Sequence, residues 1–305
     1  MSKGFDELIS GVKKIAKKKL AVANAGDRAV LEAVRDAESE GIADAILVGD
    51  SDEINRIASE MGMDISRFSV VDVKDPTEAS LRAVRFVHDG EADMYMKGFL
   101  DTKTFLKSVL DKECGLRTGK PLSHICVFEI PGIDRLLFLT DVAFMPYPTL
   151  EDKKCIIGYS VDVAKACGIE TPKVAPLAAV EVVNPKMPVT VEAGELTRMN
   201  DEGEITGCIV DGPLSMDMAI DPAASEEKGG HDRKIRGDAD ILLFPDIHAG
   251  NLVYKTIVHT VPGVRNGCIL TGTKAPVVLT SRSDTKDVKI NSIALAAVVA
   301  ESLKS

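Results

Sequence analysis

A serine, an arginine and two aspartates lie close together near the end of the 305-residue chain, as Ser281, Arg282, Asp284 and Asp287. Arginine can hold a phosphate through two hydrogen bonds, a serine hydroxyl can donate to a developing oxyanion, and a carboxylate can accept a proton. Together, these side chains are suited to acyl transfer between anionic partners. The alternative is an ordinary helix N-terminus, where Ser, Thr and Asp are favoured caps and Asp complements the helix dipole.

The elements that would position this turn are a strand and a helix. The apolar or β-branched run 277–280 predicts a buried strand, and the spacing of apolar residues over 290–303 predicts a packed helix. Residues 92–98, 209–214 and 241–251 repeat the arrangement of an apolar strand followed by a small, polar or glycine-rich turn. Because ligands of open α/β sheets bind at the carboxyl ends of strands, we expect these turns to share one cleft.

The rest of the chain alternates short apolar runs with helical patterns. Strands are expected near residues 20–23, 45–48, 68–73 and 93–96, with helices over 27–40, 52–61, 77–89 and 102–110 between and after them. The pattern implies parallel strands joined by helical crossovers. The segment Met145-Pro-Tyr-Pro148 interrupts this pattern, and the alternation of strands and helices recurs after it. We therefore expect two α/β domains with a junction there.

Composition excludes several function classes. The chain is 45% hydrophobic and 28% charged, and no apolar run approaches the roughly 20 residues that span a bilayer. The N-terminus has no basic region followed by an apolar stretch, which predicts a cytoplasmic protein. A net charge of −10 without a basic stripe argues against nucleic-acid binding, so an anionic ligand would have to be held by local basic groups.

The cysteines and histidines show no metal-binding pattern. Six scattered cysteines lack CxxC spacing, and the five histidines form neither HxxxH nor HExxH, so we expect reduced thiols and no protein-bound metal. No GxGxxG follows the first strand, whose turn reads Asn24-Ala-Gly-Asp27, and no GxxxxGK[ST] occurs. Dinucleotide and P-loop sites are therefore disfavoured.

An ordered set of short motifs resembles the phosphate acetyl/butyryltransferase family, and most closely its phosphate butyryltransferase branch. The motifs run from about residue 90 to 295: Met96-Lys-Gly98, Thr102 with Leu106, Gly115-Leu-Arg117-Thr-Gly119, Leu122-Ser-His124, Pro172-Lys-Val174, Glu181-Val-Val-Asn184-Pro-Lys-Met187, Val210-Asp-Gly-Pro-Leu214, Gly237 through Asn251, Leu279-Thr-Ser-Arg282 and Asn291-Ser-Ile-Ala-Leu295. Each motif is weak alone, and the consistent order gives the set its specificity.

The resemblance implies a reaction and a fold. The reaction is reversible transfer of a short-chain acyl group between coenzyme A and inorganic phosphate, with coenzyme A as substrate and no tightly bound cofactor. The implied fold is the two-domain α/β fold of isocitrate and isopropylmalate dehydrogenases, with mostly parallel sheets, helices on both faces and an interdomain cleft. It gives one domain of residues 1–143 plus 283–305 and a second of residues 144–282. A homodimer or larger homo-oligomer is also implied.

Roles carry over from the family by position. Ser281 matches a serine thought to stabilise the reacting acyl group, and Arg282 matches the arginine thought to hold the phosphate. The carboxylate proposed as base for the thiol matches either Asp287 or Asp284. Further candidates for substrate binding are Lys97, Thr102, Lys107, Arg117, Ser123, His124, Asn251 and Lys255. Lys107 stands where acetyl-type relatives have an arginine, which keeps the charge and loses the bidentate fork.

Plain structural interpretations of these residues stay open. Lys97 and Lys255 are also consistent with surface charges, His124 with a core histidine, and Asn251 with a helix cap. The turn 211–213 fits a structural role as well as a substrate contact.

Other functions also remain open. Within the same family, acetyl transfer is an alternative to butyryl transfer. A same-fold metal- and NAD-dependent 2-hydroxy-acid dehydrogenase would need clustered aspartates and several substrate arginines, which we do not find as a set. A relative that binds acyl-CoA without turning it over is the remaining alternative.

Overall fold

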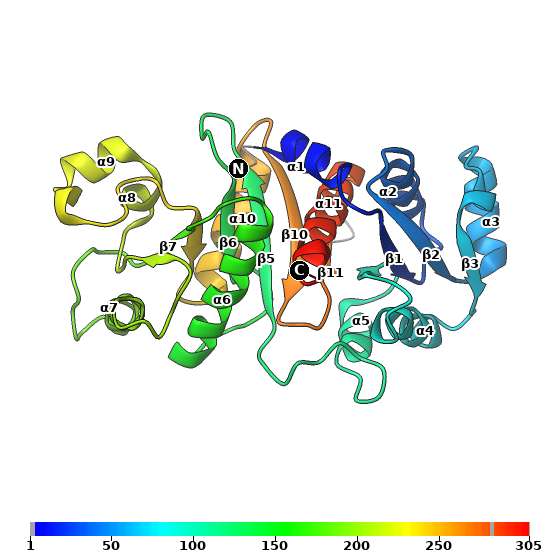
Figure 1. Cartoon of the computed structure of the whole chain (residues 1–305), viewed down its shortest axis with the longest axis horizontal. Helices are drawn as coiled ribbons and strands as arrows, with labels where there is room; N and C mark the ends of the chain where they lie inside the picture. Colours follow the sequence, from blue (N-terminus) through cyan, green and yellow to red (C-terminus); the bar gives the residue numbers. More distant parts are fainter. Residues whose placement is uncertain (1–3, 281–283, 305) are drawn as a thin grey trace. The chain divides into compact units, whose positions relative to one another are not determined.

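Two compact units make up the chain in the computed structural model, which describes residues 4–280 and 284–304. The middle unit comprises Met1–Gly4 and Pro121–Val264, and the split unit comprises Phe5–Lys120 and Arg265–Ser305. Strands and helices alternate in both (Figure 1), and most neighbouring strands are parallel. The predicted mixed α/β class with a mostly parallel sheet is confirmed.

The split unit is built on strands in the order β3-β2-β1-β4-β11-β10. Its strands are β1 (Lys18–Ala23), β2 (Ala43–Gly49), β3 (Ser69–Asp72), β4 (Met94–Lys97), β10 (Arg265–Thr271) and β11 (Val277–Val278). In the sheet order β3-β2-β1-β4-β11, each strand is parallel to the next, whereas β10 runs antiparallel to β11. The strands β4 and β11, far apart in sequence, therefore end side by side at the same edge.

Helices connect these strands, as the alternating pattern predicts. They are α1 (Phe5–Val12), α2 (Arg28–Ser39), α3 (Ser51–Glu60), α4 (Pro76–His88), α5 (Thr102–Val109) and α11 (Lys286–Ser302). An aspartate caps each of α2 to α5 by accepting main-chain hydrogen bonds of the first turn. The helix α2 packs on α11 and α4 packs on α5, and Figure 1 shows the two pairs on either side of β1. Helices thus cover both faces of this sheet.

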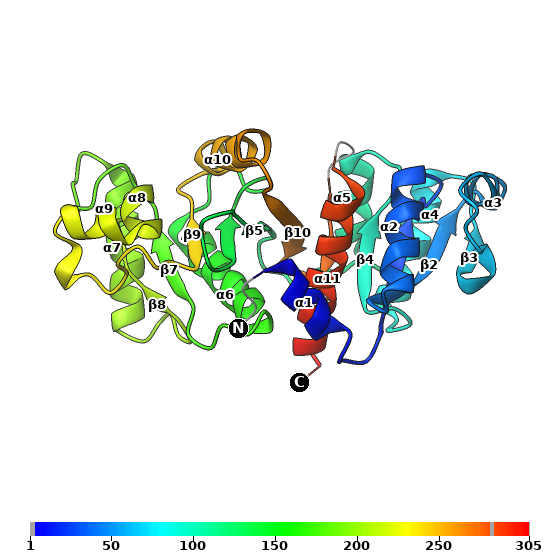
Figure 2. The same ribbon diagram turned by 90° about the horizontal axis from the view of Figure 1, so that it is seen from above.

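The middle unit has its own strands in the order β5-β6-β9-β7-β8. They are β5 (Ser123–Glu129), β6 (Leu137–Thr140), β7 (Lys173–Pro176), β8 (Ile209–Val210) and β9 (Ile241–Leu243), with β5 antiparallel to β6 and the other pairs parallel. The helices are α6 (Leu150–Ala166), α7 (Pro188–Asp201), α8 (Met216–Ile220), α9 (Pro222–Glu227) and α10 (Ile247–Thr260). In Figure 2, α10 and α6 lie on opposite sides of β9.

The unit boundaries differ from the predicted domain boundaries at 143/144 and 282/283. The chain passes from the split to the middle unit at 120/121 and returns at 264/265. The reason is strand pairing: β6 pairs with β5 and β9 in the middle unit, whereas β11 pairs with β10 and β4 in the split unit. The last helix, α11, packs on α2 within the split unit.

The described residues contain neither a membrane-spanning helix nor a group of side chains that could hold a metal ion. Over residues 4–280 and 284–304, no helix combines the length and apolar character needed to cross a membrane. Within the same ranges, no three His, Cys, Asp or Glu side chains are grouped in a way that could hold a metal ion.

Candidate functional site

A pocket of about 130 Å³ lies at the carboxyl end of β4 in the split unit. Lys97 is the last residue of β4, and Thr280 follows β11, the parallel neighbour of β4, by two residues. The lining consists of Asp27, Val30, Lys97, Gly98, Phe99, Thr280 and Lys289. The pocket is therefore at the edge of the sheet where open α/β proteins bind their ligands.

The backbone on one side of the pocket leaves no room for a side chain at Gly98. A Cβ added there would lie 2.3 Å from the carbonyl oxygen of Ala23 and 2.4 Å from that of Asn24. The main-chain N–H of Phe99 donates to the Asn24 carbonyl at 2.8 Å, and the Asn24 side chain donates back to the Phe99 carbonyl at 2.5 Å. These contacts fix the turn after β4 against the turn after β1.

Two buried lysines give the pocket its charge. Lys97 is 5% exposed and Lys289 is 4% exposed. The Lys289 ammonium donates to the carbonyl oxygen of Asp284 at 2.5 Å. Burial lowers the pKa of Lys289, and the nearby Asp284 and Asp27 carboxylates oppose that shift. The pocket therefore offers two ammonium groups, beside the Asp27 carboxylate, to an anion such as phosphate.

The described residues on either side of the predicted catalytic residues are Thr280 and Asp284. Ser281 and Arg282 lie outside the described residues, so their predicted roles stay predictions. Thr280, directly before them, is buried and lines the pocket. Asp284, just after them, is half-buried and accepts the hydrogen bond from Lys289 through its carbonyl. The described residues on both sides of the turn thus lie at or beside the pocket.

The two candidate base aspartates have different surroundings. Asp284 interacts with Lys289, whereas Asp287 is exposed and lines a separate hollow with Asp6 and Arg265 on the surface of the split unit. Asp287 and Lys289 are two positions apart in α11, about 200° around the helix axis, so their side chains leave opposite faces. The structure brings only Asp284 towards the lysine pocket.

Three other predicted substrate-binding residues of the split unit do not line this pocket. Thr102 is the exposed first residue of α5, which Asp101 caps by accepting from the Thr104 N–H at 2.9 Å. Lys107 is exposed in the last turn of the same helix. Arg117 is also exposed, in a segment bridged to Thr273. Their roles as substrate contacts stay predictions.

In the middle unit, Ser123 and His124 begin β5 and are buried. The Ser123 hydroxyl contacts the Thr140 hydroxyl at 3.1 Å, and the His124 main-chain N–H donates to the Asp141 carboxylate at 3.1 Å. Asp141 is itself buried and also accepts from the main-chain N–H groups of Ala143, Phe144 and Met145. Sequence reasoning missed Asp141, although an aspartate directly after a buried strand was the signal that could have found it.

Asn251 belongs to the same group of contacts. Its side-chain amide donates to the Val142 carbonyl at 2.9 Å. The N-terminal cap of α10 is Asp246, whose carboxylate accepts hydrogen bonds from the main-chain N–H groups of His248 and Ala249. Asn251 therefore does not cap that helix. Lys255, one turn further along α10, places its ammonium 4.7 Å from the centre of the Tyr254 ring. Asn251 thus ties α10 to the loop after β6, and Lys255 makes a cation–π contact.

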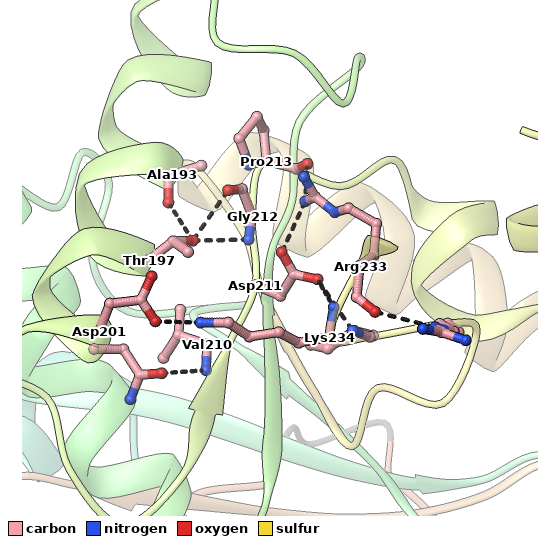
Figure 3. Close-up of polar contacts among 12 residues, drawn as sticks. Ala193, Thr197, Asp201, Val210, Asp211, Gly212, Pro213, Arg233 and Lys234 are labelled. Atoms are coloured by element: carbon pink, nitrogen blue, oxygen red, sulfur yellow. Dashed lines mark hydrogen bonds and ion pairs between the residues drawn. The ribbon is translucent and has the colours of Figure 1, made fainter. Parts of the chain in front are cut away.

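The turn at 211–213 is a structural junction (Figure 3). The buried carboxylate of Asp211 accepts from the main-chain N–H groups of Lys234 at 2.8 Å and Ile235 at 3.0 Å, and it pairs with the Arg233 guanidinium at 3.0 Å. Arg233 also donates to the Pro213 carbonyl at 2.8 Å. Because these contacts satisfy Asp211 within the protein, the structural interpretation of this turn holds.

Sequence reasoning also missed two residues of the lysine pocket. Lys289 directly precedes the apolar pattern over 290–303, and nothing in its spacing marks it as exceptional. Asp27 reads as a helix cap and does cap α2, with its carboxylate accepting from the Val30 N–H at 3.0 Å. The pairing of β1 with β4 brings Asp27 next to Lys97, and the pairing of β11 with β4 does the same for Lys289.

Comparisons with known proteins cover almost the whole chain. The family model described as "Phosphate acetyl/butaryl transferase" matches residues 5–80 and 74–297. The chain is 56% identical to a phosphate butyryltransferase of Clostridium acetobutylicum over 300 residues, which are 98% of this chain and 99% of the relative. It is 45% identical to a phosphate acetyltransferase of Thermotoga maritima over 283 residues, 93% of this chain and 95% of that protein.

A solved structure gives the same result. The branched-chain phosphotransacylase of Enterococcus faecalis V583 superposes with a TM-score of 0.81 at 33% identity, covering 93% of this chain and 99% of that one. The predicted resemblance is confirmed. The motifs, the family model and these relatives agree: the chain belongs to the phosphate acetyl/butaryl transferase family of transferases.

Proposed function

We propose that the chain moves a short-chain acyl group reversibly between coenzyme A and inorganic phosphate, giving an acyl phosphate and free coenzyme A. The observation that best supports this proposal is the pocket lined by Lys97, Lys289 and Thr280, with Asp284 accepting a hydrogen bond from Lys289. It offers buried positive charge for phosphate next to the turn with the predicted Ser281 and Arg282. Family membership supports the same reaction, and the 56% identity to a phosphate butyryltransferase favours a butyryl-sized group.

In this reaction a phosphate oxygen attacks the thioester carbonyl, the C–S bond breaks and coenzyme A leaves as a thiolate. Arg282 and Lys97 hold the phosphate, and Ser281 donates to the carbonyl oxygen as charge develops there. Loss of one such oxyanion donor costs about 100- to 1,000-fold in rate. In the reverse direction a carboxylate takes the thiol proton of coenzyme A, whose pKa of about 8.5 leaves it mostly protonated at neutral pH.

Asp284 is the better supported base. It lies beside the pocket through its contact with Lys289, whereas Asp287 lines a different surface hollow. An Asp284→Asn variant should therefore lose more activity than Asp287→Asn. General-base assistance is worth about 100- to 10,000-fold, so the two variants are readily separated.

The finer features of the fold and assembly are proposals as well. A crystal structure of 4-hydroxythreonine-4-phosphate dehydrogenase from Klebsiella pneumoniae superposes with a TM-score of 0.55 at 12% identity. This likeness supports the isocitrate and isopropylmalate dehydrogenase-like fold. The family resemblance further supports a cytoplasmic homodimer or larger assembly without a tightly bound cofactor.

The test is thiol release from acetyl-, propionyl- and butyryl-CoA, with and without inorganic phosphate. We expect release that depends on phosphate and is fastest with butyryl-CoA. Arg282→Ala should lower kcat/KM by about 100-fold or more. The control is Arg67→Ala, which removes an exposed arginine paired with Glu38 elsewhere in the split unit and should leave activity unchanged. Release that is independent of phosphate, or an unaffected Arg282→Ala variant, would refute the proposal.

A further inference from the structure

Lys289 is exceptional in its helix. In α11 it stands among buried apolar residues that include Ile290, Ile293 and Leu295, and its own side chain is 4% exposed. Lysine is almost never buried to this degree unless it is paired. Met or Leu would serve helix packing at this position without the cost of removing an ammonium group from water. Packing alone therefore does not account for a lysine here.

Lys289 lines the pocket together with a second buried lysine. Its ammonium donates to the Asp284 carbonyl, and its charged neighbours are the carboxylates of Asp27 and Asp284. Lys97, 5% exposed, lines the same pocket of about 130 Å³. An anion bound in the pocket would be attracted by both ammonium groups. The two carboxylates offset part of the charge in its absence.

Size and position indicate which anion is bound. A water molecule needs a cavity of only about 10–15 Å³, so this pocket has room for an inorganic phosphate ion. Thr280 lines it, and the next two residues are the predicted Ser281 and Arg282. The phosphate groups of coenzyme A share this chemistry, so an experiment must separate the two sources.

We propose that Lys289 is a substrate-binding residue that, together with Lys97, holds the inorganic phosphate which accepts the acyl group. The inference rests on the proposed function and adds to it a buried residue from the first turn of α11. The lysine acts as a fixed positive charge and takes no part in bond making. Removing it should therefore weaken phosphate binding and leave binding of the acyl-CoA nearly unchanged.

The experiment measures KM for phosphate and for butyryl-CoA separately in Lys289→Met. A hydrogen bond to a charged group contributes enough that its loss should raise KM for phosphate roughly 10- to 150-fold. We expect KM for butyryl-CoA to stay within about twofold. A second variant, Lys289→Gln, removes the charge but keeps a donor for the Asp284 carbonyl, and it should show the same selective rise.

Lys18→Met is the matched control. Lys18 is as buried as Lys289, at 3% exposed, and pairs with Glu301 at the start of β1. The strand register aligns Ala23, the other end of β1, with Lys97, so Lys18 is removed from the pocket along the strand. Losing this lysine tests the effect of deleting any buried ammonium group in the split unit. Both KM values should match those of the wild type.

Binding can also be measured without turnover. Inorganic phosphate should raise the melting temperature of the wild type and of Lys18→Met, because a ligand that binds the folded state stabilises it. In Lys289→Met and Lys289→Gln, this increase should be largely lost at the same phosphate concentration. A selective loss supports the inference even where turnover is too slow to measure.

The outcomes distinguish this inference from the proposed function. If the wild type releases no thiol in response to phosphate, the proposed function itself fails. If the wild type is active but both Lys289 variants keep its KM for phosphate and its melting shift, the role of Lys289 is refuted. A rise confined to KM for butyryl-CoA also refutes it, because the charge would then serve a phosphate group of coenzyme A.

Discussion

Removing the Asp211 carboxylate should destabilise the middle unit far more than removing a neighbouring exposed carboxylate. Asp211 is 5% exposed, accepts two main-chain hydrogen bonds and forms an ion pair with Arg233 (Figure 3). Each hydrogen bond to a charged acceptor contributes about 1.5–3 kcal/mol. Asp211→Asn keeps one oxygen for the main-chain donors but turns an amide towards Arg233, so we expect a loss of about 1.5–3 kcal/mol.

Asp211→Ala should cost more, about 3–5 kcal/mol, because it leaves buried donors and a partly buried guanidinium without their acceptor. The control is Asp201→Asn. Asp201 pairs with the Lys234 side chain in the same network, but its own side chain is 55% exposed. An exposed ion pair contributes only about 0–1 kcal/mol.

Urea unfolding followed by circular dichroism measures these differences as shifts of the transition midpoint. Trypsin cleavage after Arg233 or Lys234 under native conditions gives a local readout, because it reports opening of the segment that Asp211 holds. The expected order of destabilisation is Asp211→Ala, then Asp211→Asn, then Asp201→Asn. Equal midpoint shifts for the two Asn variants would show that the buried carboxylate contributes no more than a surface ion pair, and our reasoning would be wrong.

Two further predictions concern the split unit. Gly98→Ala should abolish most activity and destabilise the unit, because its Cβ would lie 2.3 Å from the Ala23 carbonyl oxygen. The control Gly11→Ala, in open space on α1, should stabilise the protein by about 0.5–1 kcal/mol. Measurements of kcat/KM and urea unfolding test both variants, and equal behaviour of the two would contradict the packing argument. Because burial lowers the pKa of Lys289, the unfolded state binds more protons above that pKa, so wild-type stability relative to Lys289→Met should rise as the pH increases towards about 10.4, the pKa of an ordinary lysine. Unfolding at neutral pH and near this upper limit measures the difference, and a constant or falling value would contradict it.

The strands and helices were largely predictable because the sequence signals are local. Apolar runs such as Leu20–Ala23 and Asp caps such as Asp27 and Asp75 act within a few residues, and the structure places β1, α2 and α4 there. The start of α11 at Lys286, four residues before its apolar pattern begins, was less visible, because its first turn is polar. Short helices at 216–220 and 222–227 have too few residues for a period to show.

The site was only partly predictable, because its remaining residues depend on long-range strand pairing. Lys97 ends a strand and belongs to a recognisable motif, so its spacing drew attention to it. Lys289 has no such signal, since a lysine in a helix usually indicates a solvated face. Its place in the pocket follows from β11 lying next to β4 and from α11 packing beneath them, and both contacts join residues nearly 200 apart in sequence.

The division of the split unit into two chain segments has a consequence for its synthesis. Residues 121–264 form most of the middle unit from one continuous stretch, so this unit can complete its fold while the chain is still growing. The split unit cannot, because β10, β11 and α11 are made last and β4 has no neighbour on that side until they emerge. Until then its unpaired strand edge is open to aggregation, so this half of the molecule depends most on prompt completion of translation.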